Sequence, residues 1–451
     1  TVTNSERRIS RVRQALPAPG AARPDWWIAN EVARRLEARL DAPAAGSRFG
    51  FADPAAVFAE HCALSIGRDL DIGGLDHARL DAQGPQQWPL PAGAAHGQAR
   101  RYADGVFATA DGRARFHPTP YRPVAEPTSA RFPLRLLTGR LRDQWHGMSR
   151  SGRVPGLFAH SPQPGLRMHP QDAARRGLSA GDLVRVTSKR GSLVLPLEPC
   201  EEMRSGDVFA AMHWNAQFLD SGGINELSLA TVDARSQQPE LKHAAVRVEK
   251  AEFGWHLLLA RRGDALALQA AAQPWLRTFG YAALSLQAET GGQDQAWLVL
   301  RAAAEQALAP AQLEALAAAL ALAAGDADTL EYRDARRGLL KRVAWRGAAP
   351  ASHLDGLLLA GAQRDAGGEA LLERALSGEV WYGARLAAFA QAGGARDPVV
   401  CQCTQVRESA IRAEAARGAA PAEIRTRLGC GSVCGSCMPQ VLRLCATAAS
   451  A

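Results

Sequence analysis

Four cysteines near the end of this 451-residue chain constrain its folding more than any other feature. Cys401 and Cys403 form a C-x-C motif, and Cys434 and Cys437 form a later C-x-x-C motif. Four thiolates at these spacings can complete one ligand shell, either around a [2Fe-2S] cluster or around a zinc ion. The sequence therefore predicts a small metal-binding domain whose fold brings the two motifs together.

The residues between and beside the motifs indicate how they meet. Segment 408–428 has the pattern of two short helices, interrupted at 418–421, with Ala, Ile and Leu on one face. Glycines beside the second motif allow backbone N–H groups to approach sulfur, and such hydrogen bonds raise the reduction potential of a cluster. The other four cysteines are interpreted as small core residues, namely Cys62, Cys200, Cys430 and Cys445.

These motifs resemble a known domain. Cys-Gln-Cys at 401–403 and Cys-Gly-Ser-Cys-Met-Pro at 434–439 are similar to the small helical [2Fe-2S] domain of bacterioferritin-associated ferredoxin, which is also found appended to nitrite and nitrate reductases. The resemblance covers residues 399–444 and implies Cys401, Cys403, Cys434 and Cys437 as cluster ligands. Cys430 has no place in that ligand set. A structural zinc knuckle is an alternative, and a disulfide is a weaker one.

Composition limits the broad class. Hydrophobic residues make up 47% and charged residues 22%, as in soluble globular proteins, and no apolar run is long enough to predict a membrane span. The chain begins without Met or a signal peptide, and we expect it to be the C-terminal portion of a longer polypeptide. A net charge of +8 suggests an anionic partner, such as nucleic acid, a phosphorylated cofactor or an anionic substrate.

The first part of the chain predicts two helices followed by a long loop-rich connection. Periodic apolar residues favour helices at 24–40 and 54–65. Residues 67–131 are rich in Gly, Pro and Asp, and they predict loops with one short strand pair at 107–116, joined at Asp111-Gly112.

The middle of the chain predicts a β-barrel. Short strands are expected at 134–137, 183–187, 192–197 and 208–212, with a hairpin turn at 188–191 and a short helix at 169–173. Gly139 and Arg140 follow the first strand, where backbone N–H groups and a guanidinium can hold a pyrophosphate or the edge of a pterin. Taken alone, this feature is more often an ordinary turn.

The same series of elements resembles the C-terminal molybdopterin-dinucleotide-binding domain of the dimethyl-sulfoxide-reductase superfamily, a double-psi β-barrel that holds two guanine dinucleotide forms of molybdopterin. The resemblance covers residues 131–250, and residues 3–8 are similar to the end of the preceding domains of that superfamily. It implies eleven candidate cofactor contacts: Thr138, Gly139, Arg140, Gln144, Trp145, His146, Ser188, Asn215, Asn225, Gln238 and Lys242.

Between the barrel and the cysteines the composition shifts to Ala and Leu. We expect a helix at 310–324, a three-stranded meander at 330–334, 339–346 and 354–360, and helices near 369–376 and 379–390. The expected fold is mixed α/β and β. Its expected domains are a tail of the molybdopterin oxidoreductase core (1–130), the barrel (131–250), an α/β spacer domain (251–397) and the helical [2Fe-2S] domain (398–451).

A barrel and a cluster of these kinds on one chain resemble an assimilatory nitrate reductase, a cytoplasmic enzyme that reduces nitrate to nitrite. The resemblance implies a molybdenum bis(molybdopterin guanine dinucleotide) cofactor, a [2Fe-2S] cluster and an electron donor such as a flavoprotein, ferredoxin or flavodoxin. The [4Fe-4S] cluster and the molybdenum-ligating residue of that family are expected upstream of Thr1, so no catalytic residue is expected in this chain.

Three alternatives stay open from the sequence. A formate dehydrogenase would share the barrel, and a non-enzymatic iron-sulfur carrier would use the four cysteines without binding a pterin. A basic nucleic-acid-binding protein with a zinc knuckle is disfavoured, because residues 399–451 contain no aromatic side chain to stack on bases. We therefore expect neither a nucleic acid nor a membrane as a partner.

Overall fold

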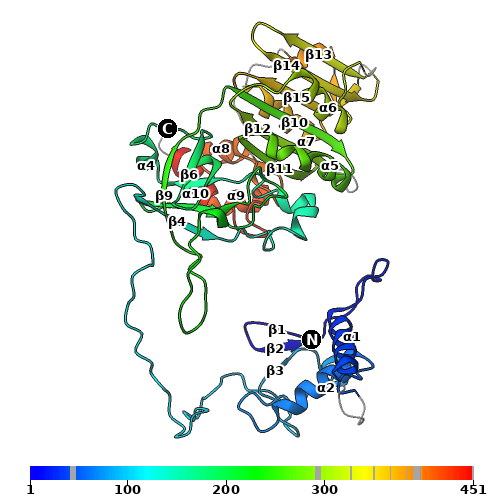
Figure 1. Ribbon diagram of the computed structural model, residues 1–451, viewed down its shortest axis with the longest axis vertical. Coiled ribbons are helices and arrows are strands. Elements are labelled where there is room, and N and C mark those ends of the chain that lie inside the picture. The colour runs from blue at the N-terminus through cyan, green and yellow to red at the C-terminus, as the bar shows by residue number, and fades with distance from the viewer. Residues whose placement is uncertain are drawn as a thin grey trace. The chain divides into compact units, whose positions relative to one another are not determined.

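The computed structural model describes residues 1–40, 47–289, 296–325, 328–348, 351–365, 367–382, 384–389, 397 and 399–448. The chain divides into two compact units, Thr1–Tyr121 and Arg122–Ala451, which run from blue to cyan and from cyan to red in Figure 1. The first unit contains three helices and a small sheet. The second contains the barrel, a larger sheet and the cysteine-rich end of the chain.

The first unit pairs β1 (Val2–Thr3), β2 (Arg8–Ser10) and β3 (Gln86–Gln87) in an antiparallel sheet. Its helices are α1 (Asp25–Arg39), α2 (Pro54–Ser65) and α3 (His77–Gln83), so the two helices predicted for this region are confirmed. Asp53 and Asp76 cap α2 and α3, because each carboxylate accepts a hydrogen bond from a backbone N–H in the first turn. Phe58, Cys62 and Leu90 belong to the buried core of this unit.

The strand pair predicted at 107–116 is wrong, because those residues form turns and irregular backbone instead of strands. The turn is closed locally: the Thr109 hydroxyl donates to the carbonyl oxygen of Arg113, and the Asp111 carboxylate accepts the Arg113 N–H. Phe116 is 94% exposed and packs into no core. A two-stranded hairpin without an apolar face to bury gains too little to form.

The barrel of the second unit is closed and has six strands, in the order β4-β8-β5-β7-β6-β9. The strands are β4 (Leu134–Gly139), β5 (Leu166–Met168), β6 (Leu183–Thr187), β7 (Ser192–Pro199), β8 (Asp207–Ala211) and β9 (Ala244–Lys250). β4 with β8 and β5 with β7 run parallel, and the other neighbours run antiparallel. Alternate apolar side chains such as Leu136, Val186 and Val246 fill the interior. The strands predicted from the sequence are confirmed.

Short helical segments lie outside the barrel wall. They are the α-helix α4 (Pro170–Ala174) and the 3-10 turns η1 (Ser151–Arg153), η2 (Pro155–Phe158) and η3 (Ile224–Leu227). The predicted helix at 169–173 is therefore confirmed, with the His169 imidazole capping its start by accepting the Gln171 N–H.

The region after the barrel forms an antiparallel sheet in the order β11-β12-β10-β15-β14-β13, with β16 paired to β15. Its strands are β10 (Trp255–Gly263), β11 (Tyr281–Ala288), β12 (Ala296–Ala304), β13 (Thr329–Asp334), β14 (Leu339–Arg346), β15 (Ala351–Gly361) and β16 (Trp381–Tyr382). The predicted meander at 330–360 is confirmed as β13, β14 and β15.

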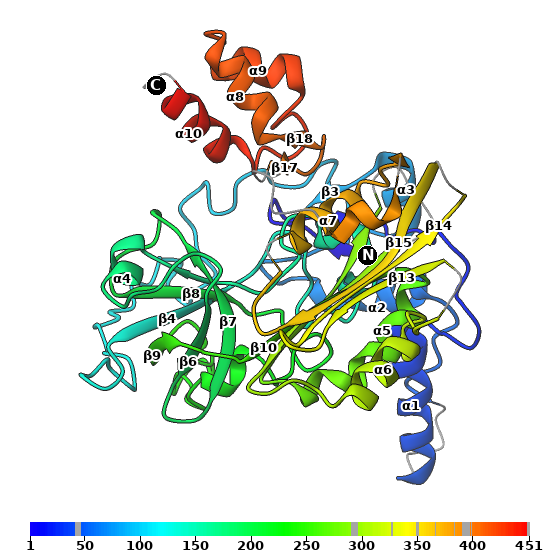
Figure 2. The ribbon, with the colours of Figure 1, turned by 90° about the horizontal axis from the view of Figure 1, so that it is seen from above.

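Helices cover both faces of this sheet, as Figure 2 shows. α5 (Ala265–Ala272) and α6 (Pro310–Ala319) belong to one apolar cluster, and α7 (Gly368–Leu376) belongs to the cluster on the other face. The 3-10 turn η4 (Gln273–Thr278) continues α5. The helix predicted at 310–324 is shorter than expected, because Ala321 adopts a positive φ of 51° that no α-helix can contain.

The helix predicted at 379–390 is wrong. Its described residues form strand β16 and a 3-10 turn, η5 (Arg385–Phe389), while residues 383 and 390 lie outside the described part of the chain. Tertiary contacts override the local pattern here. Trp381 packs edge-on against Trp345 with ring centroids 5.3 Å apart, and the Arg374 guanidinium lies 4.0 Å from the Trp381 ring centroid.

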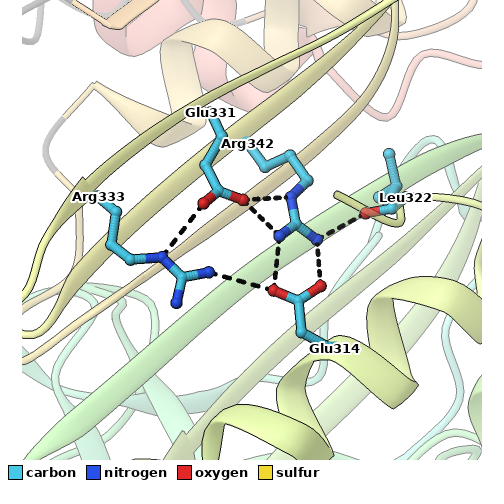
Figure 3. Close-up of polar contacts among 5 residues, drawn as sticks. All are labelled: Glu314, Leu322, Glu331, Arg333 and Arg342. Atoms are coloured by element: carbon cyan, nitrogen blue, oxygen red, sulfur yellow. Dashed lines mark hydrogen bonds and ion pairs between the residues drawn. The ribbon is translucent and has the colours of Figure 1, made fainter. Parts of the chain in front are cut away.

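A buried ionic network connects α6 with strands β13 and β14 of the meander (Figure 3). Arg342 on β14 has no exposed side-chain surface, and its guanidinium donates to Glu314 on α6, to Glu331 on β13 and to the carbonyl oxygen of Leu322. Arg333 reaches the same two carboxylates at 3.2 Å but is half exposed. The fully buried guanidinium therefore has every accessible donor directed at an acceptor, as burial of a charge requires.

The cysteine-rich end forms a separate small core. A two-stranded ladder, β17 (Val399–Cys401) and β18 (Val406–Arg407), precedes three helices, α8 (Glu408–Ala416), α9 (Pro421–Leu428) and α10 (Met438–Ala448), which appear in orange and red in Figure 2. Ile411, Ile424 and Val441 are fully buried between them. The two helices predicted at 408–428 are confirmed, with their break at Gly418, whose φ is 83°.

Candidate functional site

The four motif cysteines lie together as two pairs, each with one member from each motif. Cys403 Sγ is 3.3 Å from Cys434 Sγ, and the side chains of Cys401 and Cys437 are hydrogen-bonded to each other. The Cys401 and Cys437 pair is buried in the domain core, whereas Cys403 is exposed and Cys434 is half-buried. The fold thus gives the four sulfurs an inner pair and an outer pair.

Glycine at 431 is required by the turn that carries the second motif. Its φ is 72°, and a Cβ atom there would lie 2.3 Å from Met438 Sδ and 3.9 Å from Cys437 Sγ. Gly429 ends α9 in the left-handed conformation, and Gly435 between Cys434 and Cys437 has a φ of 74°. The glycines noted in the sequence therefore let the chain turn tightly around the sulfur atoms.

In each pair, one sulfur is stabilised as an anion by hydrogen bonds from within the cysteine-rich domain. Burial acts to raise the pKa of Cys401, but hydrogen bonds from the Thr404 hydroxyl, 3.0 Å away, and from the Gly431 N–H outweigh it, and the pKa is lowered. Hydrogen bonds from the Ser436 side chain and backbone lower the pKa of Cys434 to about 6. Metal ligation requires thiolates, so this environment favours ligation.

The partner sulfur of each pair has a raised pKa. Burial raises the pKa of Cys437 to about 11, and the hydrogen bond with Cys434 raises that of Cys403. Each pair therefore combines one sulfur with a lowered pKa and one sulfur with a raised pKa. Four sulfurs in two pairs, each supplied with hydrogen-bond donors, form a donor set that fits the two irons of a [2Fe-2S] cluster.

Two residues from the barrel region, Arg142 and His160, contact the outer pair, and Asp143 contacts His160; sequence reasoning did not single out any of the three. His160 Nε2 lies 3.9 Å from Cys403 Sγ, and its Nδ1 faces the Asp143 carboxylate. The Arg142 guanidinium hydrogen-bonds Cys434 and Ser436 Oγ, the latter at 3.2 Å. The ligand atoms of His160, Cys403 and Cys434 lie within 4.8 Å of one another. No sequence motif links positions more than two hundred residues apart, so only the fold reveals this contact.

The eleven candidate cofactor residues fall into two groups according to how their polar atoms are used. Three of them are bonded within the protein. The buried Gln144 amide joins Leu157 and Ser151, the Ser188 hydroxyl accepts the Arg190 N–H, and the Asn215 amide donates to the carbonyl oxygen of Gly147. These three side chains therefore shape the loops around the barrel end.

The other candidates have more accessible backbone or side-chain groups; Thr138 and Gly139 end strand β4, and Asn225 lies in η3. Thr138 and Lys242 contact each other across β4: the Thr138 hydroxyl donates to the carbonyl oxygen of Leu241, and Lys242 Nζ donates to the carbonyl oxygen of Thr138 at 3.2 Å. A final group of candidates is exposed, namely Arg140, Trp145, His146, Asn225, Gln238 and Lys242. Two exposed cations and several amides at one end of a barrel fit a ligand that carries phosphates.

A buried histidine that the sequence did not single out holds this loop. His213 has no exposed surface; its Nε2 accepts the Leu141 N–H at 2.8 Å, and its Nδ1 donates to the carbonyl oxygen of His146 at 2.5 Å. Those two bonds require the neutral tautomer with the proton on Nδ1. Burial lowers the pKa of His213, which agrees with the neutral form.

Acidification is expected to weaken the fold through His213. The pKa of His213 is lower in the folded state than in the unfolded state. Its contribution to stability is therefore present at pH values above the unfolded-state pKa of about 6.5, and it is lost as the pH falls through the folded-state pKa. His213→Ala is expected to cost about 1–3 kcal/mol at pH 7 and to flatten this pH dependence, because the Leu141 N–H and the His146 carbonyl lose their partner. Urea unfolding at pH 7 and pH 5 measures both effects. The exposed His61→Gln is the control, and an unchanged pH slope in His213→Ala would exclude this role.

Known protein families match two parts of the chain. Residues 134–245 match the molydopterin dinucleotide binding domain, and residues 1–35 match the molybdopterin oxidoreductase family. The first match covers the barrel strands from β4 to the start of β9. No described helix has both the length and the apolar character needed to cross a membrane.

Curated relatives include nitrate reductases and subunits of formate dehydrogenases. A nitrate reductase from Klebsiella oxytoca is 34% identical, with 99% of this chain and 48% of that protein aligned. A nitrate reductase from Synechocystis sp. is 38% identical over 55% of this chain and 34% of that protein. The alpha subunit of an F420-dependent formate dehydrogenase from Methanocaldococcus jannaschii is 29% identical, again over 55% and 34%. The chain spans less than half the length of each of these relatives. Residues 134–245 are therefore similar to a molydopterin dinucleotide binding domain and residues 1–35 to a molybdopterin oxidoreductase, and the relatives that align with these parts include nitrate reductases.

Proposed function

We propose that this chain forms part of a molybdenum-dependent nitrate reductase of the assimilatory, cytoplasmic type, which reduces nitrate to nitrite. In this proposal the barrel is of the double-psi type and binds the molybdopterin guanine dinucleotide cofactor. Cys401, Cys403, Cys434 and Cys437 bind a [2Fe-2S] cluster that relays electrons. A flavoprotein, ferredoxin or flavodoxin is the proposed electron donor, and the [4Fe-4S] cluster and catalytic metal ligand are proposed to lie outside this chain.

The observation that carries the proposal is the contact between the outer cysteine pair and the barrel region. Arg142 and His160 bring Cys434 and Cys403 against the segment that follows β4, which holds the exposed candidate cofactor contacts Arg140 and Trp145. When bound, the cluster supplies one-electron transfer and the molybdenum cofactor supplies two-electron oxo transfer. The chain's own residues hold the two sites adjacent to each other and provide cations at the cofactor end.

The Klebsiella oxytoca relative supports nitrate as the substrate. The alignment with that nitrate reductase takes in 99% of this chain, so it extends over the large sheet and the cysteine-rich end as well as the barrel. The positive net charge of +8 also suits an anionic substrate and a phosphate-bearing cofactor.

A formate dehydrogenase is the second candidate, because the Methanocaldococcus jannaschii relative carries that activity in its name. The enzyme that contains this chain should reduce nitrate with reduced viologen and should not oxidise formate. The 451-residue chain alone should turn over neither compound. Formate oxidation by the enzyme would favour the second candidate, and nitrate turnover by the isolated chain would contradict the assignment of catalysis to residues outside it.

The relay can be tested in the same enzyme. Cys434→Ser should abolish nitrate reduction driven by a reduced ferredoxin or flavodoxin, since those electrons would have to enter through the cluster. Reduced viologen is small enough to reach other redox centres, so activity with this dye should largely persist. Equal loss with both donors would show that Cys434 supports the fold instead of a relay, and no loss with either would exclude the relay.

A further inference from the structure

The segment from Thr138 to Gly147 faces two sites at once. Its exposed candidate cofactor residues include Arg140 and Trp145, while Arg142 between them contacts Cys434 and Asp143 faces His160. Arg142 Nε also lies 3.4 Å from Asp143, and Asp143 faces His160 Nδ1. One short loop thus connects the outer sulfur pair with the proposed cofactor end of the barrel.

The two sulfur pairs differ in the charge around them. The inner pair, Cys401 and Cys437, receives its hydrogen bonds from Thr404 and the Gly431 N–H, which are neutral groups of the same domain. The outer pair, Cys403 and Cys434, contacts the Ser436 hydroxyl, the His160 imidazole and the Arg142 guanidinium. Arginine stays charged at every accessible pH, so a permanent cation contacts the outer pair. The described contacts of the inner pair include no such cation.

Positive charge and hydrogen bonds at a cluster sulfur stabilise the reduced state, which carries one more negative charge. In a two-iron cluster the added electron changes one ferric iron to ferrous, and it stays on the iron whose ligands are better stabilised as anions. No bond is broken, and no proton transfer is required. The Arg142 side chain is 47% exposed, so solvent screens part of its charge and its effect should be moderate.

We propose that Arg142 is the positioning residue that sets the polarity of a bound cluster, so that an added electron would reside on the iron held by Cys403 and Cys434, the pair that faces the segment after β4. This inference rests on the [2Fe-2S] cluster of the proposed function. The external one-electron donor would supply the electron, and the molybdenum cofactor would be its final acceptor.

The reduction potential of the cluster tests the role of Arg142. The 451-residue chain is titrated with dithionite while the electron paramagnetic resonance (EPR) signal of the reduced cluster is recorded. Arg142→Gln should lower the ratio of reduced to oxidised cluster about tenfold at a fixed potential, which corresponds to about 59 mV for a one-electron couple. Arg142→Lys, which keeps the charge, should recover most of that loss.

Arg443→Gln is the matched control. Arg443 also joins the cysteine-rich domain to the barrel region, through an ion pair of 2.9 Å with Glu202, so its loss tests docking without removing the guanidinium at Cys434. Arg443→Gln should leave the potential unchanged. Equal shifts in the Arg142→Gln and Arg443→Gln chains, or no shift in either, would overturn the proposal.

A second measurement locates the added electron on one of the two irons. In chain labelled with nitrogen-15 histidine, the reduced cluster should show a hyperfine coupling to a histidine nitrogen, because His160 Nε2 lies 3.9 Å from Cys403 Sγ. His160→Phe should remove that coupling. A coupling that persists in the His160→Phe chain, or one that is absent from the wild-type chain, would contradict the assignment of the electron to the outer iron. Iron and sulfide are measured in every sample. A wild-type chain without both would overturn the proposed cluster together with this inference, whereas an intact cluster insensitive to Arg142 would overturn this inference alone.

Discussion

Replacing Cys401 by serine is expected to reduce the iron content of the chain from about two atoms to background. Cys401 is 1% exposed and lies in the core of the cysteine-rich domain beside Cys437. Serine is a hard, weakly acidic oxygen donor that suits iron-sulfur ligation poorly, and a buried site offers no water-accessible substitute ligand. Iron and acid-labile sulfide analysis of the purified chain measures the loss.

The control for this experiment is Cys445→Ser on α10. Cys445 is a half-buried thiol of the same small core, and it belongs to neither sulfur pair. This variant should keep its iron and sulfide, although it loses some packing. If the Cys401→Ser chain retained both elements at wild-type levels, Cys401 would not be a ligand and the two-pair arrangement would not describe the metal site.

Replacing Arg342 by alanine is expected to destabilise the large sheet by about 3–5 kcal/mol, because the change removes one partner from a buried ionic network. The Arg342 guanidinium is fully buried, and its loss leaves the carboxylates of Glu314 and Glu331 with only the half-exposed Arg333 as a cationic partner (Figure 3). The carbonyl oxygen of Leu322 loses its donor as well. Urea unfolding, followed by the fluorescence of the buried tryptophans, measures the change in stability.

Arg333→Ala provides the matched control, because Arg333 contacts the same two carboxylates but is 49% exposed. It should cost only about 0–1 kcal/mol, as exposed ion pairs do. Similar costs for Arg342→Ala and Arg333→Ala would show that burial of the guanidinium contributes little, contrary to this account.

The same network predicts the direction of acid sensitivity. Hydrogen bonding to Arg342 lowers the pKa of Glu314, so the stabilisation it provides is present above the unfolded value of about 4.5 and is lost as the pH falls through the lower, folded value.

The sequence predicted the elements that are determined by residues close to one another in the chain. Gly418 and Pro421 separate α8 from α9, and the glycine turns of the barrel separate short apolar strands, so both patterns could be read directly. The four-cysteine spacing also predicted which side chains would lie together. It could not show that each pair takes one cysteine from each motif, since that depends on how α8, α9 and α10 pack.

Other features depend on contacts between distant residues. The described part of the 379–390 segment is strand and 3-10 turn because Trp381 packs on Trp345, which a helical pattern cannot reveal. The contacts of Arg142 and His160 with the outer cysteine pair join residues 294 and 243 positions apart. The sequence did not single out His213, and its role in holding the loop in its neutral form follows only from its two buried hydrogen bonds.

The most direct test of the central claim is metal and sulfide analysis of the purified chain, combined with an EPR spectrum after reduction by dithionite. The account predicts about two irons and two sulfides per chain, and a reduced-state signal from one unpaired electron shared by an iron pair. About one zinc per chain with no sulfide and no such signal would contradict it, because four thiolates around zinc would hold the domain together without transferring an electron.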